Sequence, residues 1–223
     1  MYPGRVTQLL LFDVDGTLVN SEAIILTAQA QTFAAVGLPA PSRERGLSIV
    51  GLSLHEAFTV LAGPEGPVDA LVAAYREVFH ALRKAGTIGE PLYPGAAGLL
   101  ARAAADPRYR LGMATGKSRR GVAALLDAHG WHEIMATIQT ADDAPSKPHP
   151  GMILQASAAT GIPPDETVMI GDSVFDMQMA RAAGARAIGV AWGFQPVEAL
   201  QAAGAETIAA DFDDLARILQ LAG

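Results

Sequence analysis

The chain has 223 residues, and its 16 Lys or Arg against 23 Asp or Glu give a formal net charge of −7. This length suits one large domain, or one domain with an insert. The acidic balance argues against a protein that binds nucleic acid through a basic surface. The lack of any cysteine excludes disulfides, cysteine-ligated metal centres and a thiol nucleophile.

The N-terminal segment does not have the pattern of a secretory signal, because its apolar run is short and ends at Asp13. Residues 23–42 carry no charge, but several polar residues and two prolines favour an amphipathic helix over a membrane span. We therefore expect a cytoplasmic protein, monomer or homodimer, without a membrane or nucleic-acid partner.

Apolar runs of strand length, most of them ending at a polar residue, recur along the chain. They predict strands at Gln8–Asp13, Arg110–Thr115, Thr137–Thr140, Thr167–Asp172, Ala187–Ala191 and Thr207–Ala210. Helical patterns alternate with them, at Pro94–Ala105, Ser118–His129, Pro150–Thr160, Val174–Ala183 and Asp211–Leu221. The alternation predicts an α/β fold with a doubly wound, Rossmann-like parallel sheet.

Residues 19–91 interrupt that alternation with helical patterns alone, at Ser21–Val36, Ser53–Leu61 and Val68–Ala85. Loops rich in Gly and Pro separate these helices. We interpret the block as a small, all-helical cap domain inserted after the first strand. The core would then comprise residues 1–18 and 92–223.

Polar residues gather where the predicted strands end, and ligands of open α/β sheets bind at that edge. The residues are Asp13, Asp15, Gly16, Thr17, Thr115, Gly116, Lys117, Asp172 and Asp176, with Lys147 in an intervening loop. Acids placed together repel one another unless a cation lies between them. Mg²⁺ prefers such oxygen ligands, and a phosphoryl group would bridge metal, lysine and backbone N–H groups.

Four motifs carry a resemblance to a known family. They are LFDVDGTLVNSE (residues 11–22), ATGKS (114–118), SKPHP (146–150) and IGDSVFD (170–176). In this order they resemble the haloacid dehalogenase superfamily of hydrolases, and its phosphoglycolate phosphatase-like branch in particular. The match spans nearly the whole chain.

The resemblance implies a role for each matching position. Asp13 would be the nucleophile that forms an aspartyl-phosphate. Asp15 would act as general acid and then as general base, while its backbone carbonyl binds Mg²⁺. Asp13 and Asp172 would be the side-chain metal ligands, and Asp176 would lie behind them. The phosphoryl group would be bound by Gly16, Thr115, Gly116 and Lys147.

Asp15 and the cap refine this resemblance. Dehalogenases and phosphonate-cleaving members lack an acid at the position of Asp15, so it points to phosphate ester or anhydride chemistry. The stretch 49–58 lies where the family's cap has its specificity loop. Candidates for substrate contact there are Leu52, Ser53 and His55, with Arg43 and Arg45 as sources of charge. Asn20 replaces an Asp found in many relatives, at the expected hinge into the cap.

Other polar and aromatic residues have simpler interpretations. We expect Lys117, Arg119 and Arg120 to form a solvated helix face. Trp192 and Phe194 follow a strand end, and we expect them only to pack a loop.

Together these patterns predict a Mg²⁺-dependent phosphatase of a small phosphorylated metabolite. The best single substrate is 2-phosphoglycolate, and the resemblance also suggests a role in clearing such products of DNA damage. An inorganic pyrophosphatase, a sugar-phosphate phosphatase and a phosphomutase are alternatives with the same fold. The alternative outside enzymes is a phosphate-binding regulatory module that has lost activity.

Overall fold

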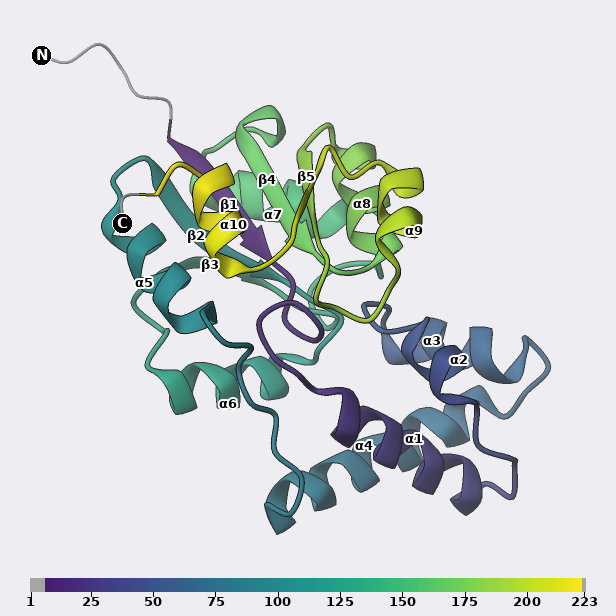
Figure 1. The fold of residues 1–223 in the computed structure, drawn as a ribbon. Coiled ribbons are helices and arrows are strands. Elements are labelled where there is room, and N and C mark those ends of the chain that lie inside the picture. Colours follow the sequence, from purple (N-terminus) through teal and green to yellow (C-terminus); the bar gives the residue numbers. More distant parts are fainter. Residues whose placement is uncertain (1–6, 222–223) are drawn as a thin grey trace, which may run out of the picture.

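The computed structural model describes residues 7–221, and within them one parallel sheet forms the centre of the fold (Figure 1). Its strands are β1 (Gln8–Phe12), β2 (Tyr109–Ala114), β3 (Met135–Gln139), β4 (Thr167–Gly171), β5 (Arg186–Val190) and β6 (Thr207–Ala209). The strand order is β3-β2-β1-β4-β5-β6. The chain adds β2 and β3 on one side of β1, and then β4, β5 and β6 on the other side. Open α/β sheets form their ligand crevice where the strand order switches in this way, here between β1 and β4.

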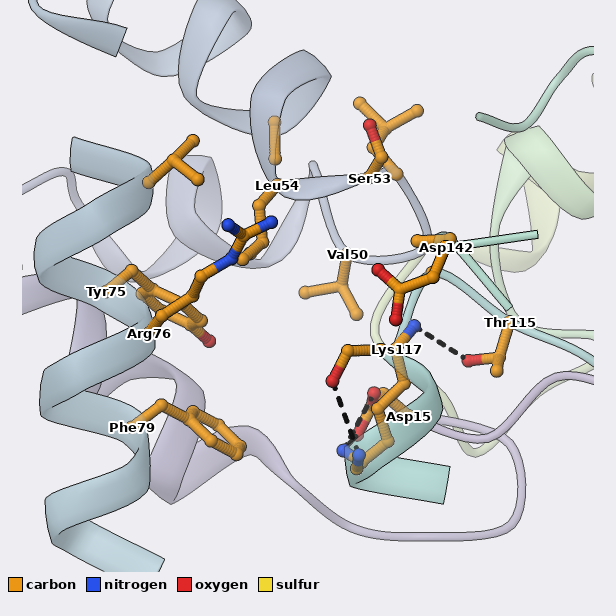
Figure 2. Close-up of a pocket in the computed structure, with 18 of the residues that line it drawn as sticks. Asp15, Val50, Ser53, Leu54, Tyr75, Arg76, Phe79, Thr115, Lys117 and Asp142 are labelled. Atoms are coloured by element: carbon orange, nitrogen blue, oxygen red, sulfur yellow. Dashed lines mark hydrogen bonds and ion pairs between the residues drawn. The ribbon is translucent and has the colours of Figure 1, made fainter. Parts of the chain in front are cut away.

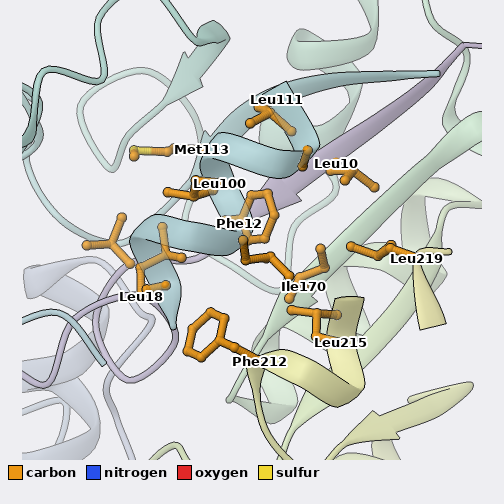
Figure 3. Close-up of a cluster of buried hydrophobic side chains, with 14 of the residues drawn as sticks. Leu10, Phe12, Leu18, Leu100, Leu111, Met113, Ile170, Phe212, Leu215 and Leu219 are labelled. Atoms are coloured by element: carbon orange, nitrogen blue, oxygen red, sulfur yellow. The ribbon is translucent and has the colours of Figure 1, made fainter. Parts of the chain in front are cut away.

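Helices cover both faces of the sheet, and β1 supplies the core of each. Leu10 and Phe12 face the layer of α5 (Ala96–Ala105), α6 (Arg119–His129) and α10 (Phe212–Ile218), part of which is drawn in Figure 3. Leu9 and Leu11 face the opposite layer, which contains α7 (Gly151–Thr160), α8 (Val174–Ala183) and α9 (Val197–Ala203). Successive side chains of a strand point to opposite faces, so a strand buried on both sides must be apolar throughout.

The predicted fold class is confirmed, with every predicted strand found in the parallel sheet. Three short elements were not predicted: α2 (Arg43–Leu47), α9 and the 3₁₀ turn η1 (Pro164–Glu166). Elements of three to seven residues are too short to display a helical period in sequence. The last helix also ends earlier than predicted, at Ile218 instead of Leu221.

Between residues 22 and 85 the structure contains helices and no strand: α1 (Glu22–Ala35), α2, α3 (Leu54–Ala62) and α4 (Val68–Ala85). In Figure 1 they lie beyond the end of β1, away from both chain termini. α4 packs against α1 and α3 around a hydrophobic cluster of its own, which includes Phe33, Phe58 and Leu71. This helical layer is called the cap below.

The two segments that join cap and core run side by side. The Asn20 N–H donates to the Pro91 carbonyl (2.8 Å), and Val19 forms an antiparallel bridge with Leu92. The Asn20 side chain accepts a hydrogen bond from the Glu22 N–H (3.4 Å), next to the start of α1. The predicted core also includes residues 1–6 and 222–223, which lie outside the described residues. No helix within residues 7–221 is both long and apolar enough to cross a membrane.

Candidate active site

Three acids meet where the two central strands end. Asp13 follows β1 and Asp172 follows β4, and the Asp13 N–H donates to the Ile170 carbonyl (2.9 Å) across this strand pair. Asp176 lies in the first turn of α8. Each of the three acids offers a carboxylate oxygen within 4.8 Å of the others, and all three are buried. The parallel pairing of β1 with β4 is thus what brings residues far apart in sequence together.

Asp13 has one carboxylate oxygen in use and one without a partner. Its Oδ1 accepts from the Val14 N–H (2.7 Å) and lies 3.1 Å from the Lys147 ammonium. Its Oδ2 is buried and has no hydrogen-bond partner within residues 7–221. Burial, together with repulsion from Asp176 and Asp15, raises the pKa of Asp13 from 3.8 to about 7 despite the neighbouring Lys147. Lys147 therefore compensates the negative charge of the Asp13 carboxylate only in part.

Lys147 is buried between two of the acids. Its ammonium lies 2.6 Å from Asp176 Oδ1 and 3.1 Å from Asp13 Oδ1. Burial alone would lower the pKa of Lys147, but the two carboxylates raise it above its usual value. The other oxygen of Asp176 accepts from the N–H and O–H of Ser173, which closes the N-terminus of α8 as a capping box. Both Asp176 oxygens are thereby engaged in holding Lys147 and α8.

Asp172 is held from two sides. Its Oδ1 accepts from the Thr17 hydroxyl (3.0 Å) and its Oδ2 from the Phe194 N–H (2.9 Å). Burial, with repulsion from Asp13 and Asp176, raises its pKa well above the usual value. The expectation that Phe194 only packs a loop is thus incomplete, because its backbone fixes an active-site carboxylate.

Gly16 lies directly against Asp172. It has a φ of +83°, and a Cβ placed there would clash with the Asp172 carboxylate. Only glycine adopts this backbone without strain and leaves room for the carboxylate. The structure therefore explains why a glycine follows Asp15.

This donor set fits a hard divalent cation such as Mg²⁺. Its ligand atoms are all oxygens, its acids repel one another, and Asp13 Oδ2 lacks a partner. Asp13 and Asp172 have the free ligand capacity, since each carboxylate oxygen accepts more than one bond. Asp176 is already engaged by Lys147 and Ser173, so it is better suited to position these groups than to bind a metal.

Thr115 and Gly116 directly follow the end of β2 and line the cavity together with Asp13 and Asp15. The Thr115 N–H donates to the Gln139 carbonyl (3.0 Å), and its buried hydroxyl accepts from the Lys117 N–H (3.2 Å). A Cβ at Gly116 would lie 2.6 Å from the Leu52 carbonyl oxygen and 2.7 Å from that of Gly51. The cap loop that contains Gly51 and Leu52 therefore packs directly against Gly116.

Lys117 is buried, so the prediction that it belongs to a solvated helix face is wrong. Its ammonium lies 2.8 and 3.1 Å from the two carboxylate oxygens of Asp15 and 3.0 Å from Glu90, and only 8% of its side chain is exposed. It also lies over the Phe79 ring, 5.5 Å from the ring centre. The helix α6 begins only after Ser118, its N-cap, so Lys117 belongs to the turn before the helix and points inward. Arg119 and Arg120 are exposed as predicted, although Arg119 pairs with Asp143.

A cavity of about 530 Å³ separates the cap from this edge of the sheet (Figure 2). Asp13, Asp15, Thr115, Gly116 and Lys117 line its core side. The predicted cap residues that line it are Leu52, Ser53 and His55. The Ser53 N–H donates to the Ser146 hydroxyl (2.8 Å) on the core, so this loop holds the cap against the core.

The two arginines expected to contact substrate do not line the cavity. The Arg45 guanidinium donates to the carbonyls of Val60 and Leu61 (3.2 Å each), and thus binds the C-terminal end of α3. Arg43 forms an ion pair with Glu22 on the surface. Contrary to the expectation, both residues contact other parts of the cap and not the cavity.

The helix α4 forms much of the cap side of the cavity, although the sequence predicted no functional residue on it. It contributes Val72, Tyr75, Arg76, Phe79, His80 and Arg83. Tyr75 and Phe79 are four residues apart, as are Arg76 and His80, so two adjacent stripes of the helix face the cavity. The four-residue spacing of these side chains is visible in the sequence and indicates that they share a face of the helix. The sequence does not indicate that this face of α4 is the one turned toward the core.

Comparison with known proteins agrees with this geometry. The model of the haloacid dehalogenase-like hydrolase family matches residues 10–190. A curated relative from Dickeya dadantii, "Probable phosphatase IndB", is 33% identical over 93% of this chain and 91% of its own. "Phosphoglycolate phosphatase" of Yersinia pestis is 33% identical over 92% and 89%, and "Pyrophosphatase PpaX" of Bacillus pumilus is 31% identical over 86% of each chain.

A solved structure shares both sequence and fold with this chain. The crystal structure of CbbY from Rhodobacter sphaeroides in complex with phosphate is 30% identical, with a TM-score of 0.77 over 94% of this chain and 96% of that one. The family match extends over most of the chain and includes the end of β1, all of β2 and all of β4, which Asp13, Thr115 and Asp172 directly follow. The chain belongs to the haloacid dehalogenase-like hydrolase family and is a phosphatase of that family.

Proposed function

We propose that this enzyme is a Mg²⁺-dependent phosphatase that acts through an aspartyl-phosphate on Asp13. The observation that carries the proposal is the buried, unpartnered Oδ2 of Asp13, beside the ammonium of Lys147 and at the wall of the cavity. A desolvated carboxylate with a free oxygen is a nucleophile that lacks only its electrophile. Lys147 offsets the repulsion between this carboxylate and an incoming phosphate.

In the first step, one carboxylate oxygen of Asp13 forms a bond to phosphorus while the bond from phosphorus to the leaving oxygen breaks. Asp15, which lines the same cavity, would act as the general acid once it is protonated and its contact with Lys117 is broken, and would give that proton to the leaving oxygen. In the second step it takes a proton from the water that attacks phosphorus, while the bond from phosphorus to Asp13 breaks and releases inorganic phosphate. The Thr115 hydroxyl and the Gly116 N–H hold the phosphoryl oxygens. Mg²⁺, held by Asp13, Asp172 and the carbonyl of Asp15, would neutralise charge on the phosphoryl group.

The substrate class is a small phosphorylated metabolite, and 2-phosphoglycolate is the first candidate. Relatives named for phosphoglycolate and for pyrophosphate are similarly close to this chain, so pyrophosphate is the second. A mutase would need a second phosphate site in the cap, and neither Arg43 nor Arg45 supplies it. We propose a cytoplasmic location for the enzyme.

Phosphate release from p-nitrophenyl phosphate, 2-phosphoglycolate, pyrophosphate and glucose 1-phosphate tests the proposal. We expect release that needs both Mg²⁺ and Asp13, so that Asp13→Asn is inactive with each substrate. Loss of substrate without matching release of phosphate would favour a mutase. Full activity of Asp13→Asn would contradict the assigned nucleophile, and tight binding without any turnover would favour the regulatory module.

A further inference from the structure

Most charged groups that line the cavity are paired within the protein. Lys117 is held by Asp15 and Glu90, and Arg83 lies 2.9 Å from the second oxygen of Glu90. Asp13 is paired with Lys147. These pairs leave little charge to attract a ligand, although the phosphorylated substrate approaches a chain with a net charge of −7.

Arg76 is the exception on the cap side. Within residues 7–221 its guanidinium has no hydrogen bond or ion pair, and Figure 2 shows it extending from α4 toward the cavity. Arg120, from α6, contacts only the ring of His80 (3.2 and 3.3 Å), which carries no negative charge. Among the described residues, the cavity therefore keeps two guanidinium groups that form no ion pair, together with the carboxylate of Asp142, which accepts from the Arg119 N–H (2.8 Å).

The wall beside Arg76 is apolar. It consists of Val50, Leu54, Val72, Tyr75 and Phe79. Tyr75 and Phe79 stack on each other, with ring centres 5.5 Å apart and planes inclined by 30°. The volume of about 530 Å³ falls in the range of roughly 300–1,000 Å³ typical of pockets that enclose drug-sized ligands. A two-carbon leaving group would leave much of this apolar surface uncovered.

We infer that the leaving group of the natural substrate has an apolar body that packs on Tyr75 and Phe79, and an anionic end that pairs with Arg76. Arg120 adds positive charge from the core side. The inference rests on the proposed phosphatase reaction and makes Arg76 a residue that determines specificity. The inference therefore departs from the two substrate candidates above, because 2-phosphoglycolate has the anion without the body, and pyrophosphate has no apolar part.

Two matched substrates test the anionic end. 4-Carboxyphenyl phosphate and 4-carbamoylphenyl phosphate have the same size and differ in the charge of the distal group. We expect the carboxylate to have a kcat/KM about 10-fold to 100-fold higher, the usual effect of a hydrogen bond between charged groups. 4-Phosphonophenyl phosphate, with a second anion that cannot be hydrolysed, tells whether the subsite prefers a carboxylate or a phosphate-like group.

Variants assign the preference to Arg76. Arg76→Gln should lower kcat/KM for the carboxylate substrate about tenfold or more, and for the carbamoyl substrate less than threefold. Arg76→Lys should keep part of the preference. The matched control is Arg181→Gln, which removes an exposed arginine of α8 outside the cavity and should change neither value.

Three outcomes would overturn the inference: equal kcat/KM for the two aryl phosphates, an equal loss with both in Arg76→Gln, or 2-phosphoglycolate as a better substrate than 4-carboxyphenyl phosphate. Calorimetric binding of the same compounds to Asp13→Asn keeps this test separate from turnover. An Arg76-dependent preference in binding without hydrolysis would support the subsite while the proposed reaction fails. Hydrolysis that depends on Asp13 but is equally efficient with a charged and an uncharged distal group would support the proposed reaction and contradict the subsite.

Discussion

The ammonium of Lys117 lies 2.8 Å from one carboxylate oxygen of Asp15 and 3.1 Å from the other. The same ammonium lies 3.0 Å from Glu90, in the segment that returns from the cap to the core. The proposed general acid and this connecting segment thus share one cation. Since Glu90 also pairs with Arg83 of α4, a movement of the cap would change the position of Glu90 and, through Lys117, the contacts of Asp15.

Replacing Lys117 with Met should destabilise the protein. Asp15 would lose its cation and face Glu90, which keeps only Arg83, and both acids are largely buried, with 13% of each side chain exposed. We expect the free energy of unfolding in urea to fall by about 1–3 kcal/mol. Adding Glu90→Gln to Lys117→Met should restore part of it, because one of the two repelling charges is gone. A double variant no more stable than Lys117→Met would contradict this account of the network.

Gly116→Ala should impair catalysis by keeping the cap from closing. The new methyl group would meet the carbonyls of Gly51 and Leu52, whereas the cap can move away from the core to relieve the clash. We expect kcat/KM for p-nitrophenyl phosphate to fall at least about tenfold, since closure completes the site, and the stability to change by less than about 1 kcal/mol.

Gly98→Ala is the matched control for that variant. Gly98 lies within α5, and a Cβ there meets nothing within 4 Å. Because alanine favours a helix more than glycine does, this change should stabilise the protein by about 0.5–1 kcal/mol and leave the kinetics as they are. Similar kinetic losses in both variants would contradict a specific contact between Gly116 and the cap.

Lys147→Met should make stability depend on the divalent cation. The change leaves Asp13 and Asp176 buried without their shared cation, and removal of one partner of a buried pair costs about 3–5 kcal/mol. Denaturation in urea with EDTA should show this loss. A saturating Mg²⁺ concentration should recover more stability in the variant than in the wild type, because the metal then supplies the only compensating charge. An equal gain in both proteins would argue against a metal beside Asp13.

Stabilisation by Mg²⁺ should increase as the pH rises through about 7. The pKa of Asp13 is raised from 3.8 to about 7 in the folded chain without metal, so the folded state binds the extra proton between these values. Stability of the metal-free protein should therefore fall between about pH 4 and pH 7. Mg²⁺ binds the deprotonated carboxylate, so the shift in Tm on adding it should be larger at pH 8 than at pH 5. Equal shifts at the two pH values would contradict this.

The positions of the core acids were predictable because they depend on the sheet alone. Gln8–Asp13 and Thr167–Asp172 have the continuous apolar pattern of strands buried on both faces, and parallel strands end at one edge. Asp13 and Asp172 meet there in the structure, as expected from that pattern. The chemistry of the edge follows from the residue types, without knowledge of side-chain directions.

The cap side was not predictable in the same way, because it depends on contacts between distant segments. Arg45 lies in a helix of five residues and binds the end of α3, while Arg76 of α4 faces the cavity instead. Lys117 adjoins the start of α6, and its inward direction is set by Asp15 and Glu90. No local pattern distinguishes an arginine that binds a helix end from one that faces a ligand.

The proposed mechanism requires a phosphoryl-enzyme on Asp13. Mass spectrometry of acid-quenched enzyme tests it most directly, with Asp15→Asn used to slow the second step and p-nitrophenyl phosphate as a substrate whose leaving group needs no proton. We predict the added mass of one phosphoryl group on the peptide that contains Asp13, and none when Asp13→Asn is also introduced. Phosphate release by the wild type, with the phosphoryl group found on another residue, would contradict the account.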